Sequence, residues 1–197
     1  NVKVNSDNFK NALPRELSGC QGQRAMIVMS SLTKPKLLIA DEPTTGLDVT
    51  LKKIVVEKFK DLKNQISDKF SMIFISHDLN MVRRATDRMN VMYKGIIIEN
   101  GFSNEFIEVQ NHHPYTSKLI NITKSNFNNS YISENDDMDS SYKGGCSYYE
   151  LCEHASKDDR CANISPPAFS IKDKKIVISE DPTISWAKCW AFQGDSK

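Results

Sequence analysis

The sequence lacks the features that mark membrane-spanning, secreted and nucleic-acid-binding proteins. No apolar run approaches the roughly 18 to 20 residues that a bilayer-spanning helix needs. The first five residues contain no basic region followed by an apolar stretch, so we expect no signal peptide. A net charge of +1 over 197 residues gives no general reason to expect binding to nucleic acid or to an anionic surface. The first residue is not methionine, and we expect the chain to begin inside a longer protein.

Cysteine is also scarce, and its distribution is uneven. Five cysteines in 197 residues are too few for a disulfide scaffold. Cys20 stands alone, and the other four follow residue 145: Cys146, Cys152, Cys161 and Cys189. Four thiolates can hold an iron–sulfur cluster or a tetrahedral zinc ion, although none of these four forms a C-x-x-C pair. The spacing therefore leaves both a metal centre and reduced structural thiols open.

What the sequence does have is a regular alternation of strand and helix patterns. Apolar residues at steps of three or four predict helices, and short continuous apolar runs predict strands that are buried on both faces. The expected helices are residues 17–32, 51–66 and about 79–86, and the expected strands are 37–40, 72–75, 91–93 and 96–98. The last two strands flank Lys94-Gly95 as a hairpin. This order predicts an α/β fold with a mostly parallel sheet and flanking helices.

The composition changes after about residue 122. Residues 124–145 are rich in asparagine, serine and acidic side chains, and we expect a disordered linker there because they cannot bury enough apolar surface. Residues 146–197 form a small irregular tail that carries the four late cysteines. His112 and His113, which precede the change, are interpreted as a loop that starts a helix rather than as a pair of metal ligands.

Two adjacent carboxylates, Asp41 and Glu42, end the first predicted strand. Ligands of open α/β sheets bind at the carboxyl ends of the strands, where a carboxylate can hold Mg²⁺, often through water. A second carboxylate can polarise an attacking water molecule. Taken alone, the pair is more simply explained as a solvated acidic turn.

Three further motifs surround the acidic pair in a fixed order. Residues 17–24 read LSGCQGQR, residues 45–48 read TGLD, and residues 76–78 read SHD at the end of the second strand. This order resembles the ATP-binding subunits of ABC transporters, with a signature motif, a Walker B strand, a D-loop and a switch histidine. The similarity is greatest to the branch that imports oligopeptides and dipeptides. It is carried by ADEPTTGLDVT at 40–50, VMYKG at 91–95 and HPYT at 113–116.

The resemblance implies catalytic roles for three residues. Glu42 would be the general base for the water that attacks the γ-phosphate of ATP. His77 would contact that phosphate, and Asp41 would hold Mg²⁺ through water. Without the order of motifs, a lone histidine at a strand end is more simply a structural hydrogen-bonding group.

The resemblance also implies a dimer that sandwiches nucleotide. Ser18, Gly19 and Gln21 would face ATP bound by the opposite subunit, because N–H groups and a hydroxyl at a helix N-terminus form an anion site. Asp48 would bridge the two subunits and can also cap the helix that follows it. Taken alone, Ser18 and Gly19 are most simply explained as a helix cap.

The chain departs from the family pattern in three places. It contains no Gly-Lys dipeptide, so it lacks the Gly-x-x-x-x-Gly-Lys-Ser/Thr loop that cradles phosphates in the Walker A region. Cys20 stands where the family usually has glycine, and Gly22 stands where a basic residue is common. We therefore expect the C-terminal part of a subunit, inactive alone, whose ability to activate a partner is in question.

The tail also has a family counterpart. In similar subunits a four-cysteine C-terminal extension is common, and some members bind a 4Fe–4S cluster with it. The resemblance thus implies that Cys146, Cys152, Cys161 and Cys189 are candidate cluster ligands. Reduced structural thiols remain the alternative, and disulfides are less favoured in a cytosolic subunit.

The sequence as a whole predicts a partial ABC nucleotide-binding domain over residues 1–110, an extension helix over 111–123, a linker over 124–145 and the cysteine tail over 146–197. It predicts a subunit that uses ATP and Mg²⁺ to energise import of peptides or a similar small solute. The expected location is the cytoplasmic face of the plasma membrane.

The expected partners are a second ATP-binding subunit (identical or different), transmembrane permease subunits and, indirectly, an extracytoplasmic solute-binding protein. No nucleic acid is expected. Two alternatives stay open. One is a non-catalytic partner that completes another subunit's ATP site, and the other is a metal- or redox-responsive module built on the tail.

Overall fold

A computed structural model describes residues 11–66, 70–106, 108, 111–124, 144–155 and 159–193. The chain forms two compact units, Asn1–Ala85 and Thr86–Lys197. Most of the expected linker lies outside the described residues, and the boundaries proposed at residues 110, 123 and 145 stay predictions. Among the helices that are described, none has the length and apolar character needed to cross a membrane.

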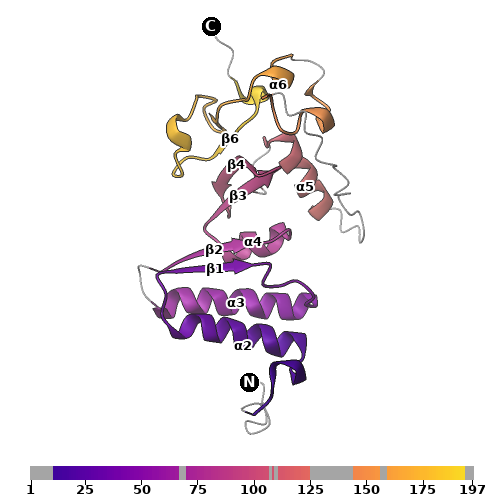
Figure 1. Ribbon diagram of the computed structural model, residues 1–197. Helices are drawn as coiled ribbons and strands as arrows, with labels where there is room; N and C mark the ends of the chain where they lie inside the picture. The colour runs from indigo at the N-terminus through magenta and orange to yellow at the C-terminus, as the bar shows by residue number, and fades with distance from the viewer. Residues whose placement is uncertain are drawn as a thin grey trace. The chain divides into compact units, whose positions relative to one another are not determined.

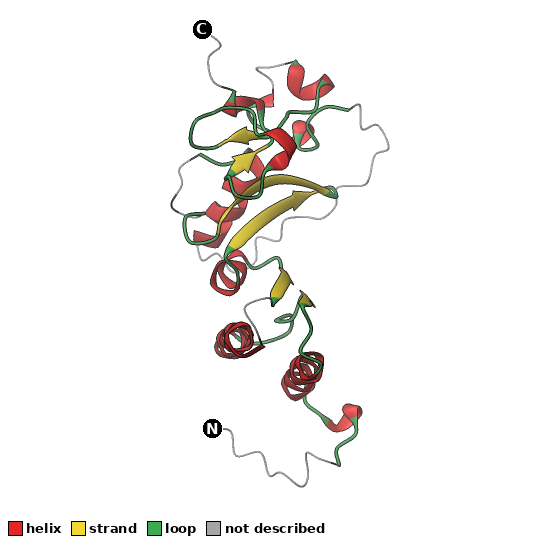
Figure 2. Ribbon diagram, turned by 90° about the vertical axis from the view of Figure 1, so that its left-hand side faces the viewer, coloured by secondary structure: helices red, strands yellow, loops and turns green. Residues whose placement is uncertain are grey.

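The first unit is built on two parallel strands and three α-helices (Figures 1 and 2). A short 3-10 turn, η1 (Pro14–Glu16), precedes them. The elements then follow as α2 (Gly19–Leu32), β1 (Leu37–Asp41), α3 (Val49–Ile66), β2 (Ser71–Ile75) and α4 (Leu79–Ala85). These elements confirm the predicted helices and strands to within a few residues at their ends.

The core of this unit lies on one face of the two-stranded sheet. Leu38 and Ala40 of β1 and Phe74 of β2 are buried there against α3 and α4. The rings of Phe59 and Phe74 meet edge to face, with centroids 5.7 Å apart. Burial of these aliphatic and aromatic side chains is the main stabilising contribution to the unit.

The other face of the sheet carries exposed aliphatic side chains. Leu37, Ile39, Ile73 and Ile75 are 50, 60, 48 and 46% exposed. The prediction that residues 37–40 are buried on both faces is therefore wrong for the described residues. Side chains alternate along a strand, and the described helices cover only the face that carries Leu38 and Ala40.

The second unit is built on a four-stranded antiparallel sheet with the order β3-β4-β6-β5. The hairpin of β3 (Arg88–Tyr93) and β4 (Ile96–Phe102) confirms the predicted turn, in which Lys94 and Gly95 both have positive φ. It forms the long curved strands in Figure 2. Two short strands of the cysteine tail, β5 (Phe169–Ser170) and β6 (Trp186–Ala187), extend the sheet.

Helices complete the second unit. The longest is α5 (Pro114–Lys124), which begins directly after the two histidines, as predicted. In its described residues the tail contributes the short helical segments η2 (Tyr149–Leu151), α6 (Arg160–Asn163), η4 (Ile178–Glu180) and η5 (Trp190–Phe192). The tail is therefore irregular, as expected, but its strands pair with the hairpin rather than standing apart from it.

Candidate functional site

Glu42 lies in the turn that follows β1. Its backbone N–H donates to the carbonyl of Ile75 at 3.0 Å, which ties the ends of the two parallel strands together. Its φ angle is +44°, in the left-handed region that non-glycine residues seldom adopt. Such conformations are costly and cluster at functional sites. The fold thus holds this carboxylate at the edge where α/β sheets bind ligands.

Both oxygens of the Glu42 carboxylate accept hydrogen bonds. Oε1 lies 2.9 Å from Nδ1 of His77 and 3.1 Å from the backbone nitrogen of the same residue. Oε2 accepts from the hydroxyl of Thr45 at 2.8 Å. Burial acts to raise the pKa of Glu42, but the hydrogen bonds from Thr45 and His77 outweigh it and lower the pKa. Glu42 is therefore an ionised acceptor at neutral pH.

His77 lies two residues after the end of β2 and is the histidine partner of Glu42. Because a carboxylate only accepts hydrogen bonds, Nδ1 of the ring must carry the proton that is shared with Glu42. The side chain of His77 is 75% exposed, and that of Glu42 is 37% exposed. The imidazole can therefore contact a ligand from solvent while it holds the carboxylate.

The remaining residues proposed for catalysis and binding lie in exposed positions of the same unit. Asp41 is the last residue of β1 and is exposed, which suits a carboxylate that would hold a hydrated cation. Asp48 accepts from the backbone N–H groups of Thr50 and Leu51 at 2.9 and 3.0 Å, which confirms that it caps α3. Its proposed role at a dimer interface stays a prediction.

The start of α2 is a capping box. The hydroxyl of Ser18 accepts from the N–H of Gln21 at 3.3 Å, and Oε1 of Gln21 accepts from the N–H of Ser18 at 2.9 Å. These contacts confirm the helix-cap interpretation of Ser18 and leave Ser18, Gly19 and Gln21 exposed at a helix N-terminus. The side chain of Cys20 lies outside the described part of the chain.

One connection within this unit was not predicted. Nε2 of Gln23, on α2, donates to the backbone carbonyl of Thr45 at 3.2 Å. Thr45 in turn donates to Glu42. Gln23 and Thr45 both belong to the motifs that carry the family resemblance, but sequence spacing could not show that their side chains and backbones meet.

The four late cysteines converge in the second unit. All four are thiols rather than disulfides. The pKa of Cys189 is raised to about 12, mainly by burial and in part by the other three thiols, while a hydrogen bond from the Ala191 backbone opposes the rise. The backbone N–H of Cys146 donates to the carbonyl of Cys161 at 2.8 Å. Gly145 is needed here, since a Cβ atom on it would lie 2.3 Å from the carbonyl oxygen of Ala162.

A single metal ion does not fit these thiols as they are placed. No group of three or more histidine, cysteine or acidic side chains within the described ranges is arranged to hold one.

His113 lies close to the four cysteines, with its Nε2 4.0 Å from Sγ of Cys146. Because Nδ1 of His113 accepts from the backbone N–H of Tyr115 at 3.1 Å, the ring proton is on Nε2. Burial lowers the pKa of His113 to about 4.

His112 forms the second carboxylate–imidazole pair of the molecule. Its Nδ1 lies 2.5 Å from Oε1 of Glu99, and Oε2 of Glu99 accepts from the backbone N–H of His113 at 2.8 Å. The Glu99 side chain is fully buried, and that of His112 is 5% exposed. This pair joins β4 to the start of α5 and explains both histidines without a metal ion.

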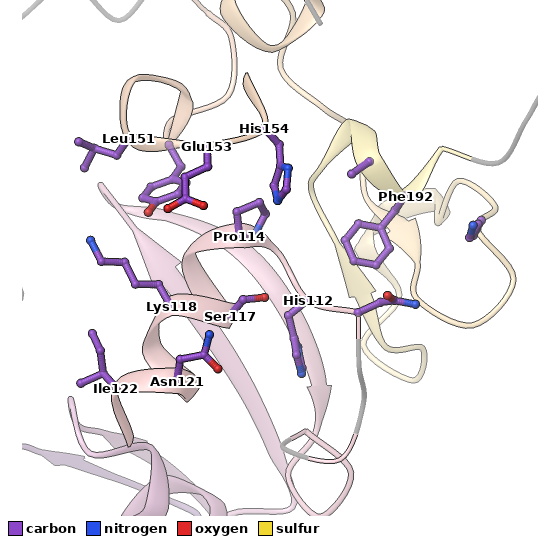
Figure 3. Close-up of a pocket in the computed structure, with 14 residues that line it drawn as sticks. His112, Pro114, Ser117, Lys118, Asn121, Ile122, Leu151, Glu153, His154 and Phe192 are labelled. Atoms are coloured by element: carbon purple, nitrogen blue, oxygen red, sulfur yellow. The ribbon is translucent and has the colours of Figure 1, made fainter. Parts of the chain in front are cut away.

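The second unit also contains a cavity of about 770 Å³ beside α5. Figure 3 shows Ser117, Lys118 and Asn121 projecting from α5 on one side and Leu151, Glu153 and His154 on the other. The lining mixes lysine, glutamate, histidine and apolar side chains, so it does not favour a purely anionic, cationic or apolar ligand.

Comparison with known proteins places these observations in a family. Residues 2–45 match the model of the ABC transporter family. The chain is 48% identical over 110 residues to the oligopeptide transport ATP-binding protein OppD of Bacillus subtilis, and 50% identical over 109 residues to the peptidoglycan transport ATP-binding protein YejF of Agrobacterium fabrum. These matches cover 56 and 55% of this chain. These matches confirm the resemblance to the ATP-binding proteins of ABC transporters over part of the chain.

A longer match extends into the cysteine tail. The oligopeptide transport ATP-binding protein AppD of B. subtilis is 36% identical over an aligned length of 173 residues, and the match covers 83% of this chain. The matches span 50% of AppD, 30% of OppD and 19% of YejF. The chain thus covers at most half the length of these relatives. Its P-loop NTPase fold agrees with the mixed parallel and antiparallel sheets of the structure.

Proposed function

We propose that this chain forms the hydrolytic side of an ATP site in an ABC transporter that imports peptides or a similar small solute. The observation that carries the proposal is the Glu42–His77 pair at the ends of two parallel strands. In this position Glu42 accepts a proton from the attacking water. At the same time the oxygen of that water forms a bond to the γ-phosphorus. The bond from phosphorus to the β-bridging oxygen breaks, and ADP and phosphate leave.

The residues around Glu42 supply the remaining chemistry. The lowered pKa keeps the base ionised, and His77 holds its orientation and presents its exposed ring to the γ-phosphate. Mg²⁺, when bound, neutralises charge on the phosphates, and Asp41 would hold it through water. Most of the catalytic effect in such a site is positioning and electrostatic stabilisation.

The site needs residues from outside this chain. No Gly-Lys dipeptide is present, so another segment or subunit must supply the loop that cradles the phosphates. The names of the relatives mention transport of oligopeptides and of peptidoglycan, which supports peptides or a similar solute as the cargo class. We further propose that the chain works at the cytoplasmic face of the membrane with permease subunits and a second ATP-binding subunit.

A chimera tests this proposal. The chain is joined to the preceding part of the B. subtilis OppD relative, which is to supply the missing phosphate loop, and phosphate release from ATP is measured. We expect hydrolysis by the chimera, its loss in Glu42→Gln, and no turnover by the chain alone. Glu57→Gln on the exposed side of α3 is the matched control. Robust turnover by the isolated chain would contradict the proposal.

A second function is favoured by the exposed N-terminus of α2. The capping box holds Ser18, Gly19 and Gln21 there, and in this second function they would complete the ATP site of another subunit. In a mixed complex with an intact ATP-binding subunit, hydrolysis that survives Glu42→Gln in this chain would favour this assembly role. Hydrolysis that is lost would favour the catalytic role.

We also propose that the tail holds a 4Fe–4S cluster. The convergence of four thiols supports it, because four thiolates can hold such a cluster. Iron and acid-labile sulfide should be found in anaerobically purified protein and be lost in Cys189→Ser but not in Cys20→Ser. A colourless, metal-free anaerobic preparation would count against the cluster and for structural thiols.

A further inference from the structure

We infer that the cavity beside α5 binds a small zwitterion, a molecule with an ammonium group and a carboxylate group, such as an amino acid or a short peptide. The cavity is lined by charges of both signs that lack protein partners in the described structure. The inference goes beyond the proposed function, because the cavity lies in the second unit whereas Glu42 and His77 lie in the first.

The cavity has the size of a small-molecule site. Its volume of about 770 Å³ lies within the roughly 300–1,000 Å³ that is typical of ligand pockets. Ser117, Lys118 and Asn121 project from α5 on one side (Figure 3). Glu153 and His154, which follow η2, lie on the other side. A ligand between these two sides can therefore contact both at once.

Three charged side chains in the lining carry the inference. Lys118 and Lys174 are cationic, Glu153 is anionic, and all three are exposed. None of the three side chains forms an ion pair or a hydrogen bond within the part of the chain that the structure describes. The lining thus offers opposite charges that remain to be paired by a ligand.

A ligand with only one kind of charge would leave part of this lining unpaired. An anion could pair with the two lysines, but Glu153 would repel it. A cation could pair with Glu153, but the lysines would repel it. A zwitterion satisfies both, because its carboxylate can accept hydrogen bonds from the lysines while its ammonium donates to Glu153.

The rest of the lining suits the body of such a molecule. The hydroxyl of Ser117 and the amide of Asn121 can each donate and accept a hydrogen bond, as a peptide group requires. Apolar side chains complete the lining and can contact an aliphatic side chain of the ligand: Pro114, Ile122, Leu151 and Phe192.

A buried polar atom without a partner also belongs to the cavity lining. His112 lines the cavity, and its Nε2 is buried with no hydrogen-bond partner among the residues that the structure describes. The ring is held in place by the bond between Nδ1 and Glu99. Buried polar atoms are normally paired, so this nitrogen supports the presence of a polar ligand.

The test is calorimetric titration of the full chain with L-leucine and with the dipeptide leucylleucine, without ATP. We expect saturable binding of at least one of them, and the comparison shows whether a free amino acid or a peptide is preferred. The N-acetylated form of the ligand lacks the ammonium, and the amidated form lacks the carboxylate. Each should bind about tenfold more weakly, because one charged hydrogen bond is lost.

Variants of the protein assign the two ends of the ligand. Glu153→Gln should weaken binding of the unblocked and the amidated ligand about tenfold and leave binding of the N-acetylated ligand unchanged. The double variant Lys118→Met, Lys174→Met should weaken binding of the unblocked and the N-acetylated ligand and leave that of the amidated ligand unchanged. Such non-additivity shows that the altered groups contact each other.

Matched controls lie in the same unit outside the cavity lining. Glu150→Gln and Lys172→Met each remove the same kind of charge from an exposed position, and both should bind the ligand as the wild type does. The measurements with blocked ligands use the wild-type protein, so they do not depend on the folding of any variant.

Three outcomes would overturn the inference. The first is the absence of saturable binding of both ligands. The second is equal binding of blocked and unblocked ligands. The third is saturable binding of inorganic phosphate alone, which would assign the cavity to anions. Because the titrations use neither nucleotide nor metal, their failure is distinguishable from a failure of the chimera to hydrolyse ATP.

Discussion

The two units of the molecule each contain a glutamate paired with a histidine, in opposite environments. Glu42 and His77 are joined at 2.9 Å with side chains that are 37 and 75% exposed. Glu99 and His112 are joined at 2.5 Å with side chains that are 0 and 5% exposed. In the exposed pair, a bound ligand can replace one of the hydrogen bonds between the two side chains. The buried pair is closed to solvent and links β4 with α5.

The two pairs show that a carboxylate–imidazole pair is not by itself a catalytic site. Exposed ion pairs contribute little to stability and stay available to solvent and ligands. Buried pairs are costly to break, because removal of one partner leaves the other without compensation. Exposure and placement at the strand ends distinguish the proposed catalytic glutamate from the structural one.

The largest expected effect is on the buried pair. Glu99→Ala removes the acceptor of the His112 ring and of the His113 backbone N–H. We expect it to lower the free energy of unfolding of the second unit by about 3–5 kcal/mol. Urea denaturation followed by tryptophan fluorescence measures this, since both tryptophans lie in that unit. A loss below about 1 kcal/mol would contradict the structural role.

The next effect is acid sensitivity of the same unit. Burial holds the pKa of His113 at about 4, below its ordinary 6.5. The unfolded chain therefore binds more protons than the folded one between these values, so stability falls as the pH drops from about 6.5 to about 4. The loss should reach about 3 kcal/mol in metal-free protein.

Denaturation at a series of pH values checks this, with His113→Asn as the comparison. The variant lacks the titrating ring, so its stability should change less over that range. An equal pH dependence in both proteins would assign the acid sensitivity to other groups.

A smaller effect is expected at the exposed pair. Glu42→Ala should change the free energy of unfolding by no more than about 1 kcal/mol, because the lost hydrogen bonds lie in solvent-exposed positions. Thermal unfolding of the first unit measures the change. If Glu42→Ala lowered the free energy of unfolding as much as Glu99→Ala, the exposed pair would be as important for stability as the buried one, and this prediction would be wrong.

The smallest effect is the response to salt. Raising the ionic strength from about 0.1 to 1 M shortens the Debye length from about 10 to 3 Å and weakens the exposed pair. The titration of Glu42, whose pKa is lowered in part by the charge of His77, should then move to higher pH. The destabilisation caused by Glu99→Ala should not depend on salt, and denaturation at both ionic strengths provides the check.

The sequence was most informative where a local pattern has one physical solution. Apolar runs followed by Asp41-Glu42 and by Ser76-His77 predicted two neighbouring strand ends, and the structure brings Glu42 and His77 together there. The role of Asp48 as a cap could likewise be predicted, because capping depends only on the next three residues.

The sequence was least informative where residues far apart must meet. The two-residue strands β5 and β6 are too short to show any alternation, so their pairing with β4 could not be predicted. Glu99 follows an apolar run and gave no sign that His112 would bury it. The exposed face of β1 was missed because an apolar run shows how many aliphatic side chains a strand has, but not which face is covered.

The order of strands in the second sheet also sets when this unit can form during synthesis. Asn100 of β4 pairs with Trp186 of β6, near the end of the described chain. The hairpin therefore emerges from the ribosome before β6 exists, and this edge of β4 stays unpaired until residues 186 and 187 have been synthesised. Open strand edges recruit other chains, and contacts between distant residues form slowly. A ribosome that stops before β6 would release a hairpin whose β4 edge is open to pairing with other chains.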